Sequence, residues 1–107
     1  MEKEKGNIIY IGKKPLNIYV LSVATAMKKG DVTIKARGQA ISTAVDTALV
    51  SQDRLDLKQK NINIKTEEVD IKERNEQGEE TGQTIKHNFS AIEITIGKHT
   101  TGKGQGK

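Results

Sequence analysis

The spacing of apolar residues divides the first half of the chain into two strand–helix pairs. Residues 7–11 form a nearly continuous apolar run, which is typical of a strand buried on both faces. The run from Pro15 to about Lys29 repeats at helical spacing, and Pro15 suits a first helical turn because its missing N–H has no partner there. The predicted helix ends at Gly30. Its apolar stripe contains Leu16, Tyr19, Val20, Val23, Ala24 and Met27.

The second pair has a cleaner pattern. Residues 31–37 alternate between apolar and polar side chains, which predicts a strand with one buried face. Gly38 interrupts the pattern, and a helix is predicted over about residues 39–54. Leu55 and Leu57 follow the helix and are predicted to be exposed. The strand buries Val32, Ile34 and Ala36 and exposes Thr33, Lys35 and Arg37, and the helix stripe contains Ala40, Ile41, Ala44, Val45, Ala48 and Leu49.

Two further strands are predicted in the second half of the chain. Residues 60–68 form the third strand, with Ile62 and Ile64 on one face. The alternation then shifts by one residue, which predicts a bulge at 66–68. Residues 89–97 form the fourth strand. Its inward residues are Ile92, Ile94 and Ile96, and its outward residues are Glu93 and Thr95.

A long arm joins these two strands. Residues 72–87 have few apolar anchors and predict a β-hairpin arm with a mobile tip at 77–82. The element order is therefore β-α-β-α-β-β, which predicts an α+β fold. We expect a two-layer sandwich with a four-stranded mixed sheet, two helices on one face and the arm extending beyond the body. Residues 7–97 form the predicted domain, and residues 1–6 and 98–107 form flexible charged tails.

Composition limits what this domain can contain. The chain has 107 residues, of which 34% are hydrophobic and only 3% aromatic, so its core is thin and would gain from burial in a dimer. The absence of cysteine excludes disulfides and thiolate metal sites. No apolar run approaches the roughly 20 residues of a membrane span, and the charged N-terminus does not match a signal peptide. We expect a soluble, intracellular protein.

The net charge of +4 is unevenly distributed. Residues 1–37 carry +5, residues 38–97 carry −4 and residues 98–107 carry +3. A protein that is basic at one end and acidic at the other suits oriented binding of a polyanion. A solvated lysine and glutamate surface is the alternative explanation.

Basic residues recur where each of the first two strands gives way to a helix. Lys13 and Lys14 follow the first strand, and Lys35 and Arg37 lie on the polar face of the second. Turns of this kind commonly lie at one edge of an α/β layer, so these side chains are expected to converge on a nucleic-acid backbone. Alternatively, the two loop lysines are merely solvated and Arg37 pairs with an acid such as Asp46 or Asp53.

Other kinds of chemistry find little support. The first turn lacks the glycine and hydroxyl positions of a phosphate-binding loop, which argues against nucleotide hydrolysis. His87 and His99 are isolated, and no serine has an evident His/Asp partner, so neither a metal site nor an enzyme is predicted, and no cofactor. With so few aromatic residues, base stacking is poorly supported as the main binding mode, and backbone contacts are favoured.

Over residues 7–97 the chain resembles the Alba family, small basic chromatin proteins of archaea with RNA-associated relatives in eukaryotes. Two long motifs at this separation make the match specific. The matching segments are Ile11-Gly12-Lys13-Lys14-Pro15, Tyr19-Val20-Leu21, Ile34-Lys35-Ala36-Arg37-Gly38, Ala40-Ile41-Ser42, Ala44-Val45-Asp46-Thr47 and Ile92-Glu93-Ile94.

The resemblance implies a homodimer that binds double-stranded DNA, and often RNA, without sequence specificity. It places Lys13 and Lys14 at the centre of the binding face, makes Arg37 a backbone contact and lays the arms along the minor groove. Lys13 matches an acetylation site whose modification weakens DNA binding. The second helix and last strands are implied to form the dimer surface. The candidate nucleic-acid-binding residues are Lys13, Lys14, Asn17, Lys35, Arg37, Gln39, Arg54, Arg74 and Lys86.

The chain departs from the family pattern at several positions. Gln39 replaces a second arginine, and Asn17 is displaced by one residue from the usual asparagine. Leu55 replaces the aromatic residue implicated in dimer–dimer packing on DNA, and is the candidate for that contact. The arm is longer than usual and acidic near its tip, so the tip bends away from phosphate, pairs with a cation of the arm such as Lys72, Arg74 or Lys86, or meets a protein.

Three functions therefore remain open. The first is an architectural DNA-binding dimer of the chromosome or nucleoid in the cytoplasm. The second is an RNA-binding protein of RNA maturation or stability that uses the same basic face. The third is a protein-interaction adaptor that uses the acidic arm and Leu55.

Overall fold

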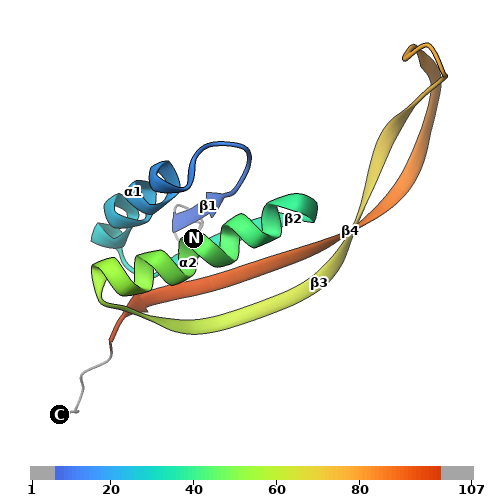
Figure 1. Cartoon of the computed structure of the whole chain (residues 1–107). Helices are drawn as coiled ribbons and strands as arrows, with labels where there is room; N and C mark the ends of the chain where they lie inside the picture. The colour runs from blue at the N-terminus through green and yellow to red at the C-terminus, as the bar shows by residue number, and fades with distance from the viewer. Residues whose placement is uncertain (1–6, 100–107) are drawn as a thin grey trace.

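The computed structural model describes residues 7–99 of the chain (Figure 1). Two strand–helix pairs come first, and two long strands follow them. The elements are β1 (Ile8–Tyr10), α1 (Leu16–Ala26), the 3-10 turn η2 (Met27–Lys29), β2 (Val32–Arg37), the 3-10 turn η3 (Gly38–Ala40), α2 (Ile41–Leu55), β3 (Leu57–Arg74) and β4 (Glu80–Lys98). This order confirms the predicted β-α-β-α-β-β arrangement.

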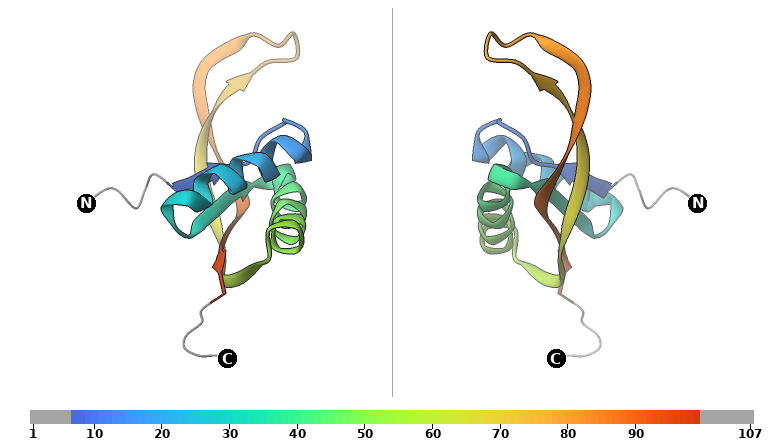
Figure 2. Two further views of the ribbon diagram at one scale, coloured as in Figure 1. Left: turned by 90° about the vertical axis from the view of Figure 1, so that its left-hand side faces the viewer. Right: turned by 90° about the vertical axis from the view of Figure 1, so that its right-hand side faces the viewer.

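The four strands form one mixed sheet in the order β1-β2-β4-β3. β1 runs parallel to β2, whereas β2 and β3 both run antiparallel to β4. Both helices lie on the same face of the sheet (Figure 2). The predicted α+β sandwich is confirmed, and within residues 7–99 no helix covers the other face of the sheet.

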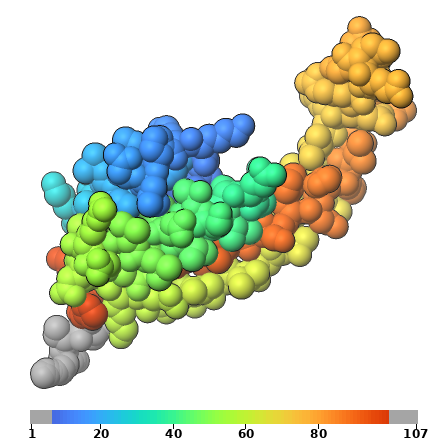
Figure 3. Space-filling view, viewed as in Figure 1, coloured from blue at the N-terminus to red at the C-terminus, as the bar shows by residue number. Residues whose placement is uncertain are grey.

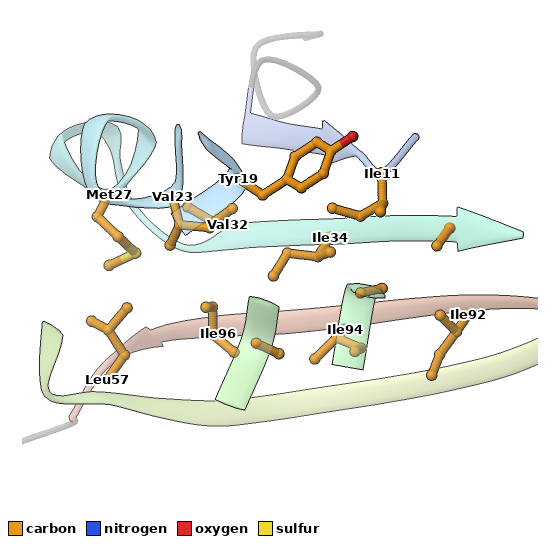
Figure 4. Close-up of a cluster of buried hydrophobic side chains, with 13 residues drawn as sticks. Ile11, Tyr19, Val23, Met27, Val32, Ile34, Leu57, Ile92, Ile94 and Ile96 are labelled. Atoms are coloured by element: carbon orange, nitrogen blue, oxygen red, sulfur yellow. The ribbon is translucent and has the colours of Figure 1, made fainter. Parts of the chain in front are cut away.

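The core lies between the helices and the sheet (Figure 4). The predicted inward residues of β2 and β4 are buried, and Val32, Ile34 and Ile96 are fully so. α1 contributes Tyr19 and Val23, the following turn η2 contributes Met27, and α2 contributes two alanines, which let the helix approach the sheet closely. The stripes were predicted too broadly, since Leu16 of α1 and Leu49 of α2 are exposed.

Two burial predictions were wrong. The first strand is not buried on both faces, because helices cover only one side of the sheet, and Tyr10 on the other side is 70% exposed. Leu57 is not exposed but buried, because it begins β3 beneath the helices, and Leu55 is partly buried against the core.

The predicted bulge at 66–68 is also absent. β3 keeps continuous register with β4 from Asn61 to Lys72, and its irregularities fall at Gln59/Asn61 and Lys72/Arg74. The shift in the apolar pattern has another cause, which is that the two halves of β3 use opposite faces. Ile62 and Ile64 pair with inward residues of β4, whereas Val69 and Ile71 lie on the opposite face.

The far halves of β3 and β4 form the arm that projects from the body (Figures 1 and 3). The described chain measures 61 × 28 × 22 Å because of this projection. At the turn, the Asn75 side-chain oxygen accepts hydrogen bonds from the backbone N–H groups of Gln77 and Glu79, at 2.9 and 3.0 Å. A single polar side chain thus shapes the tip.

Candidate nucleic-acid interface

Two turns carry the candidate basic residues: the first basic turn follows β1 and holds Lys13 and Lys14, and the second follows β2 and includes Lys35 and Arg37 at the end of that strand. Both basic turns lie at the same edge of the sheet. β1 and β2 are parallel, with Tyr10 opposite Lys35, so both strands end at this edge. The Ile11 N–H donates to the Lys35 carbonyl at 2.9 Å and extends the pairing just past β1. Figure 1 shows the loop after β1 and the end of β2 at the same end of the molecule, where the arm also departs.

A buried tyrosine organises the first turn. The Tyr19 hydroxyl accepts hydrogen bonds from the backbone N–H groups of Gly12 and Lys14, at 2.7 and 2.9 Å. The ring of Tyr19 is only 5% exposed, so the hydroxyl fixes the loop to the core. Lys13 and Lys14 are exposed on this fixed backbone. Sequence reasoning treated Tyr19 only as a core residue, although a buried tyrosine hydroxyl usually requires a partner.

At the second turn, the charged side chains form ion pairs on the face of the sheet opposite the helices, which we call the open face. Lys35 lies 3.4 Å from Glu93, and Arg37 lies 3.5 Å from Glu67. The Arg37 guanidinium also stands 5.5 Å from the centre of the Phe89 ring. The ion-pair alternative for Arg37 is therefore realised, with Glu67 as the acid. Asp46 and Asp53 belong to α2, which covers the other face.

Lys65 links these pairs into a network. It lies 3.0 Å from Glu93 and 3.9 Å from Glu67. The hydrogen bond from Lys65 holds the pKa of Glu93 below its usual value, and Lys35 acts in the same direction. The hydrogen bond and charge of Glu93 in turn raise the pKa of Lys65. At neutral pH the open face thus carries both signs of charge.

The remaining candidates of the body lie apart from one another. Asn17 is exposed in the first turn of α1, next to the basic loop, and Gln39 is exposed in η3 beside Arg37. Arg54 is exposed in the last turn of α2, at the end of the helix away from the two basic turns (Figure 1). α2 has 15 residues, which corresponds to about 22 Å at the usual helical rise. Arg54 is not brought together with the other basic residues.

The arm cations face acids of the arm itself. Arg74 lies 3.2 Å from Glu80, which Lys72 also approaches at 3.8 Å. Lys86 lies 3.4 Å from Asp70 and 3.8 Å from Glu68. Of the outcomes predicted for the acidic tip, pairing with Lys72 and Arg74 is observed for Glu80. Within residues 7–99, no ion pair involves Lys13 or Lys14, which distinguishes them from the arm cations.

Other sites are sparse in the described part of the chain. His99 approaches Asp56 at 3.3 Å, and His87 lies against the Phe89 ring. Among residues 7–99, no group of three His, Cys, Asp or Glu side chains is arranged to hold a metal ion. Within that range no helix has the length and apolar character needed to cross a membrane.

The fold and the basic edge define a small α+β domain of a recognisable kind. The Alba family model matches residues 7–68. DNA/RNA-binding protein Alba of Methanocella arvoryzae is 46% identical over 94 residues, which cover 84% of this chain and 88% of that protein. DNA/RNA-binding protein Alba 1 of Archaeoglobus fulgidus is 43% identical over 96 residues, which cover 86% of this chain and 96% of that protein. The chain belongs to the Alba family.

Solved structures agree with this assignment. Alba from Thermoplasma volcanium superposes with a TM-score of 0.67 at 38% identity, covering 86% of this chain and all of that one (100%). ALBA1 from Trypanosoma brucei superposes with a TM-score of 0.61 at 20% identity, covering 86% of this chain and 68% of that one. The second likeness concerns the fold alone.

Proposed function

We propose that this protein is a homodimeric, sequence-nonspecific binder of double-stranded DNA that acts as an architectural protein of the chromosome or nucleoid in the cytoplasm. The observation that carries the proposal is the pair of basic turns at one sheet edge, with Lys13 and Lys14 presented on a fixed loop. Relatives at 43–46% identity are named DNA/RNA-binding proteins, which supports the same class of ligand. This site has no catalytic role.

The edge offers phosphate two kinds of contact. Lys13 and Lys14 supply exposed charge at the start of α1, where the helix dipole also favours an anion. Arg37 and Lys35 contribute after exchanging a carboxylate for phosphate, and the neutral Asn17 and Gln39 donate hydrogen bonds beside them. Arg74, Lys86 and Arg54 are secondary contacts, because acids pair the first two and distance separates the third. Such contacts position the duplex without reading its sequence.

The dimer is proposed to form through α2 and β3. Leu49 on α2 is 56% exposed, and Ile62 and Ile64 on the helix-covered side of β3 are 44% and 72% exposed. These exposed apolar side chains continue the core cluster beyond the region that the helices cover. A second copy of the chain would bury them. Ile64→Glu is expected to convert a dimer into a monomer in sedimentation experiments, whereas Leu21→Glu, at an exposed site of α1, leaves the dimer intact.

Acetylation of Lys13 would regulate binding. The side chain is exposed on the loop and open to modification. Acetylation removes its charge and therefore one charge-assisted phosphate contact per subunit. Leu55, half-buried at the end of α2, remains the candidate for contacts between dimers along DNA.

A second candidate function is RNA binding through the same edge. It is supported by the DNA/RNA-binding names of the relatives and by the mixed charge of the open sheet face. Competition between duplex DNA and structured RNA for the wild-type protein separates the two functions.

The test is a salt series of binding to duplex DNA and to RNA, with Lys13→Ala/Lys14→Ala beside the wild type. The double variant should lower the slope of log K against log salt by about 2 per subunit if both lysines contact phosphate. Lys28→Ala/Lys29→Ala is the matched control, because it removes the same charge from exposed residues at the other end of α1. Binding without salt dependence, or an unchanged slope in the loop variant, would contradict the proposal.

A further inference from the structure

A hollow on the open face of the sheet lies beside the proposed phosphate-binding edge. Its volume is about 380 Å³, near the lower end of the range of ligand pockets, roughly 300–1,000 Å³. The small side chain of Ala91 lies opposite Arg37 in the sheet and leaves space between longer neighbours. The lining side chains on this face are Tyr10, Lys35, Arg37, Glu67, Ala91 and Glu93.

Tyr10 forms the wall of this hollow at the edge of the sheet. It belongs to the edge strand β1 and lies opposite Lys35 on the face without helices. Its side chain is 70% exposed, which contrasts with Tyr19, the other tyrosine, at 5%. An exposed aromatic ring beside cations offers a nucleobase a stacking surface.

The paired charges of the hollow can bind the edge of a base without exchanging partners. Glu93 and Glu67 accept from Lys35, Arg37 and Lys65, so two carboxylates already occupy the cations. A phosphate must first displace a carboxylate from these cations, whereas the edge of a base presents donors and acceptors together and can bind beside the existing pairs. Glu67 is the more loosely held acid, at 3.5 Å from Arg37 and 3.9 Å from Lys65, so its oxygens can also accept from an exocyclic amino group.

We propose that this hollow binds an unpaired nucleobase of RNA, stacked on Tyr10 and hydrogen-bonded through its amino group to Glu67. Bases in duplexes are stacked inside and out of reach, whereas RNA loops and bulges present them splayed out. The proposal rests on the proposed nucleic-acid-binding function, because Lys13 and Lys14 hold the flanking backbone at the same edge. It adds one base contact to an otherwise sequence-independent surface.

The experiment compares an RNA hairpin with one bulged guanosine, the same hairpin with a bulged uridine, and the fully paired parent. Tyr10→Ala should weaken binding of the bulged-guanosine RNA by about tenfold, the usual order for loss of one base–aromatic stack, and leave the paired RNA unchanged. Tyr10→Phe should retain the affinity. Leu21→Ala, which removes an exposed apolar side chain from α1, should change neither affinity.

Two further readouts test the geometry. The chain has no tryptophan, so stacking on Tyr10 should quench tyrosine fluorescence in the wild type, and Tyr10→Phe should abolish the quenching while binding persists. Glu67→Ala should remove the preference for guanosine over uridine at the bulge, because no side-chain acceptor is left for the amino group of the base. Each variant is assayed with both RNAs, so any general gain in RNA affinity that comes from releasing Arg37 cancels in the comparison.

The failures of the two proposals are distinguishable. If Lys13→Ala/Lys14→Ala weakens binding of every ligand but Tyr10→Ala weakens none, the base hollow is wrong and the proposed function stands. If the wild type binds neither DNA nor RNA, the proposed function falls as well. Equal Tyr10 dependence with a bulged DNA duplex would overturn the assignment to RNA.

Discussion

The two basic turns at the sheet edge carry similar residues but hold their charges in opposite ways. The backbone of the loop at Gly12–Pro15 is fixed by the Tyr19 hydroxyl, and its lysines are exposed. In the second turn, Arg37 and Lys35 are held by carboxylates on neighbouring strands. Under the proposed function, the first turn meets a phosphate directly, whereas the second must first release a carboxylate. The difference teaches that cation count alone does not define a phosphate site.

The largest expected effect is a loss of stability when Gly38, in the second basic turn, is replaced. Gly38 has a φ of +61°, and a Cβ there would meet the Phe89 ring at 3.4 Å. Gly38→Ala should lower the free energy of unfolding by about 1–2 kcal/mol, the cost of a left-handed conformation in other residues. Denaturant unfolding measures this. Gly78→Ala, also at positive φ (+83°) but with open space around it, should lose a similar amount, because 3.4 Å is an ordinary van der Waals distance and the strain lies in the backbone at both positions. No loss in either variant would contradict this explanation.

The next effect concerns the first turn. Tyr19→Phe removes the acceptor of two backbone N–H groups and should cost about 1 kcal/mol in stability. It should also weaken duplex DNA binding several-fold, because Lys13 and Lys14 lose their fixed loop. Tyr10→Phe deletes the same atom at an exposed site and should do neither. Unchanged DNA affinity in Tyr19→Phe would show that the loop needs no tether.

A smaller effect should follow from releasing Arg37. Glu67→Gln removes the acid 3.5 Å from its guanidinium. The exposed pair contributes less than about 1 kcal/mol, so stability should barely change. Duplex DNA should bind about twofold to threefold more tightly, with a steeper salt dependence, because a free arginine gains a phosphate contact. Glu76→Gln removes the same charge at the arm tip and controls for net charge. Equal gains in both variants would argue against Arg37.

The smallest expected effect is a pH dependence of the stability that Glu93 contributes on the open face. Because the folded pKa of Glu93 is lowered from 4.5, its contribution to stability is present above pH 4.5 and disappears as pH falls through the folded pKa. The difference in melting temperature between wild type and Glu93→Gln should therefore be small at neutral pH and vanish in acid. A difference that grows as the pH falls would contradict this sign.

Much of the fold was predictable because burial imposes a period on the sequence. β2 and β4 alternate cleanly since one face of each packs under the helices, and their inward residues were correctly identified. β3 lacks this clear period because its outer half leaves the body, so no covered face constrains its apolar residues. The shift in its apolar pattern is typical of a bulge, but here it arises because Val69 and Ile71 lie on the opposite face.

The convergence of the basic residues at one edge was predictable, whereas their ion-pair partners were less so. Parallel neighbouring strands place their ends together, which located Lys13, Lys14 and Arg37 at one edge. The pairing of Arg37 with Glu67 joins residues 30 positions apart and depends on the register of β3 and β4, which no local pattern reveals. The role of the Tyr19 hydroxyl was missed because the spacing of apolar residues indicates that the ring is buried but does not indicate what its oxygen binds.

The position of β3 at the edge of the sheet has a consequence for solubility. An edge strand of 18 residues exposes a long row of unpaired backbone groups, which is a template for pairing with other chains. Charged side chains recur along it, from Lys58 and Lys60 to Glu68, Asp70 and Lys72. These charges protect the edge against fibril-like association, and the uncharged stretch from Asn61 to Ile64, which lacks them, depends on the proposed partner copy for its cover.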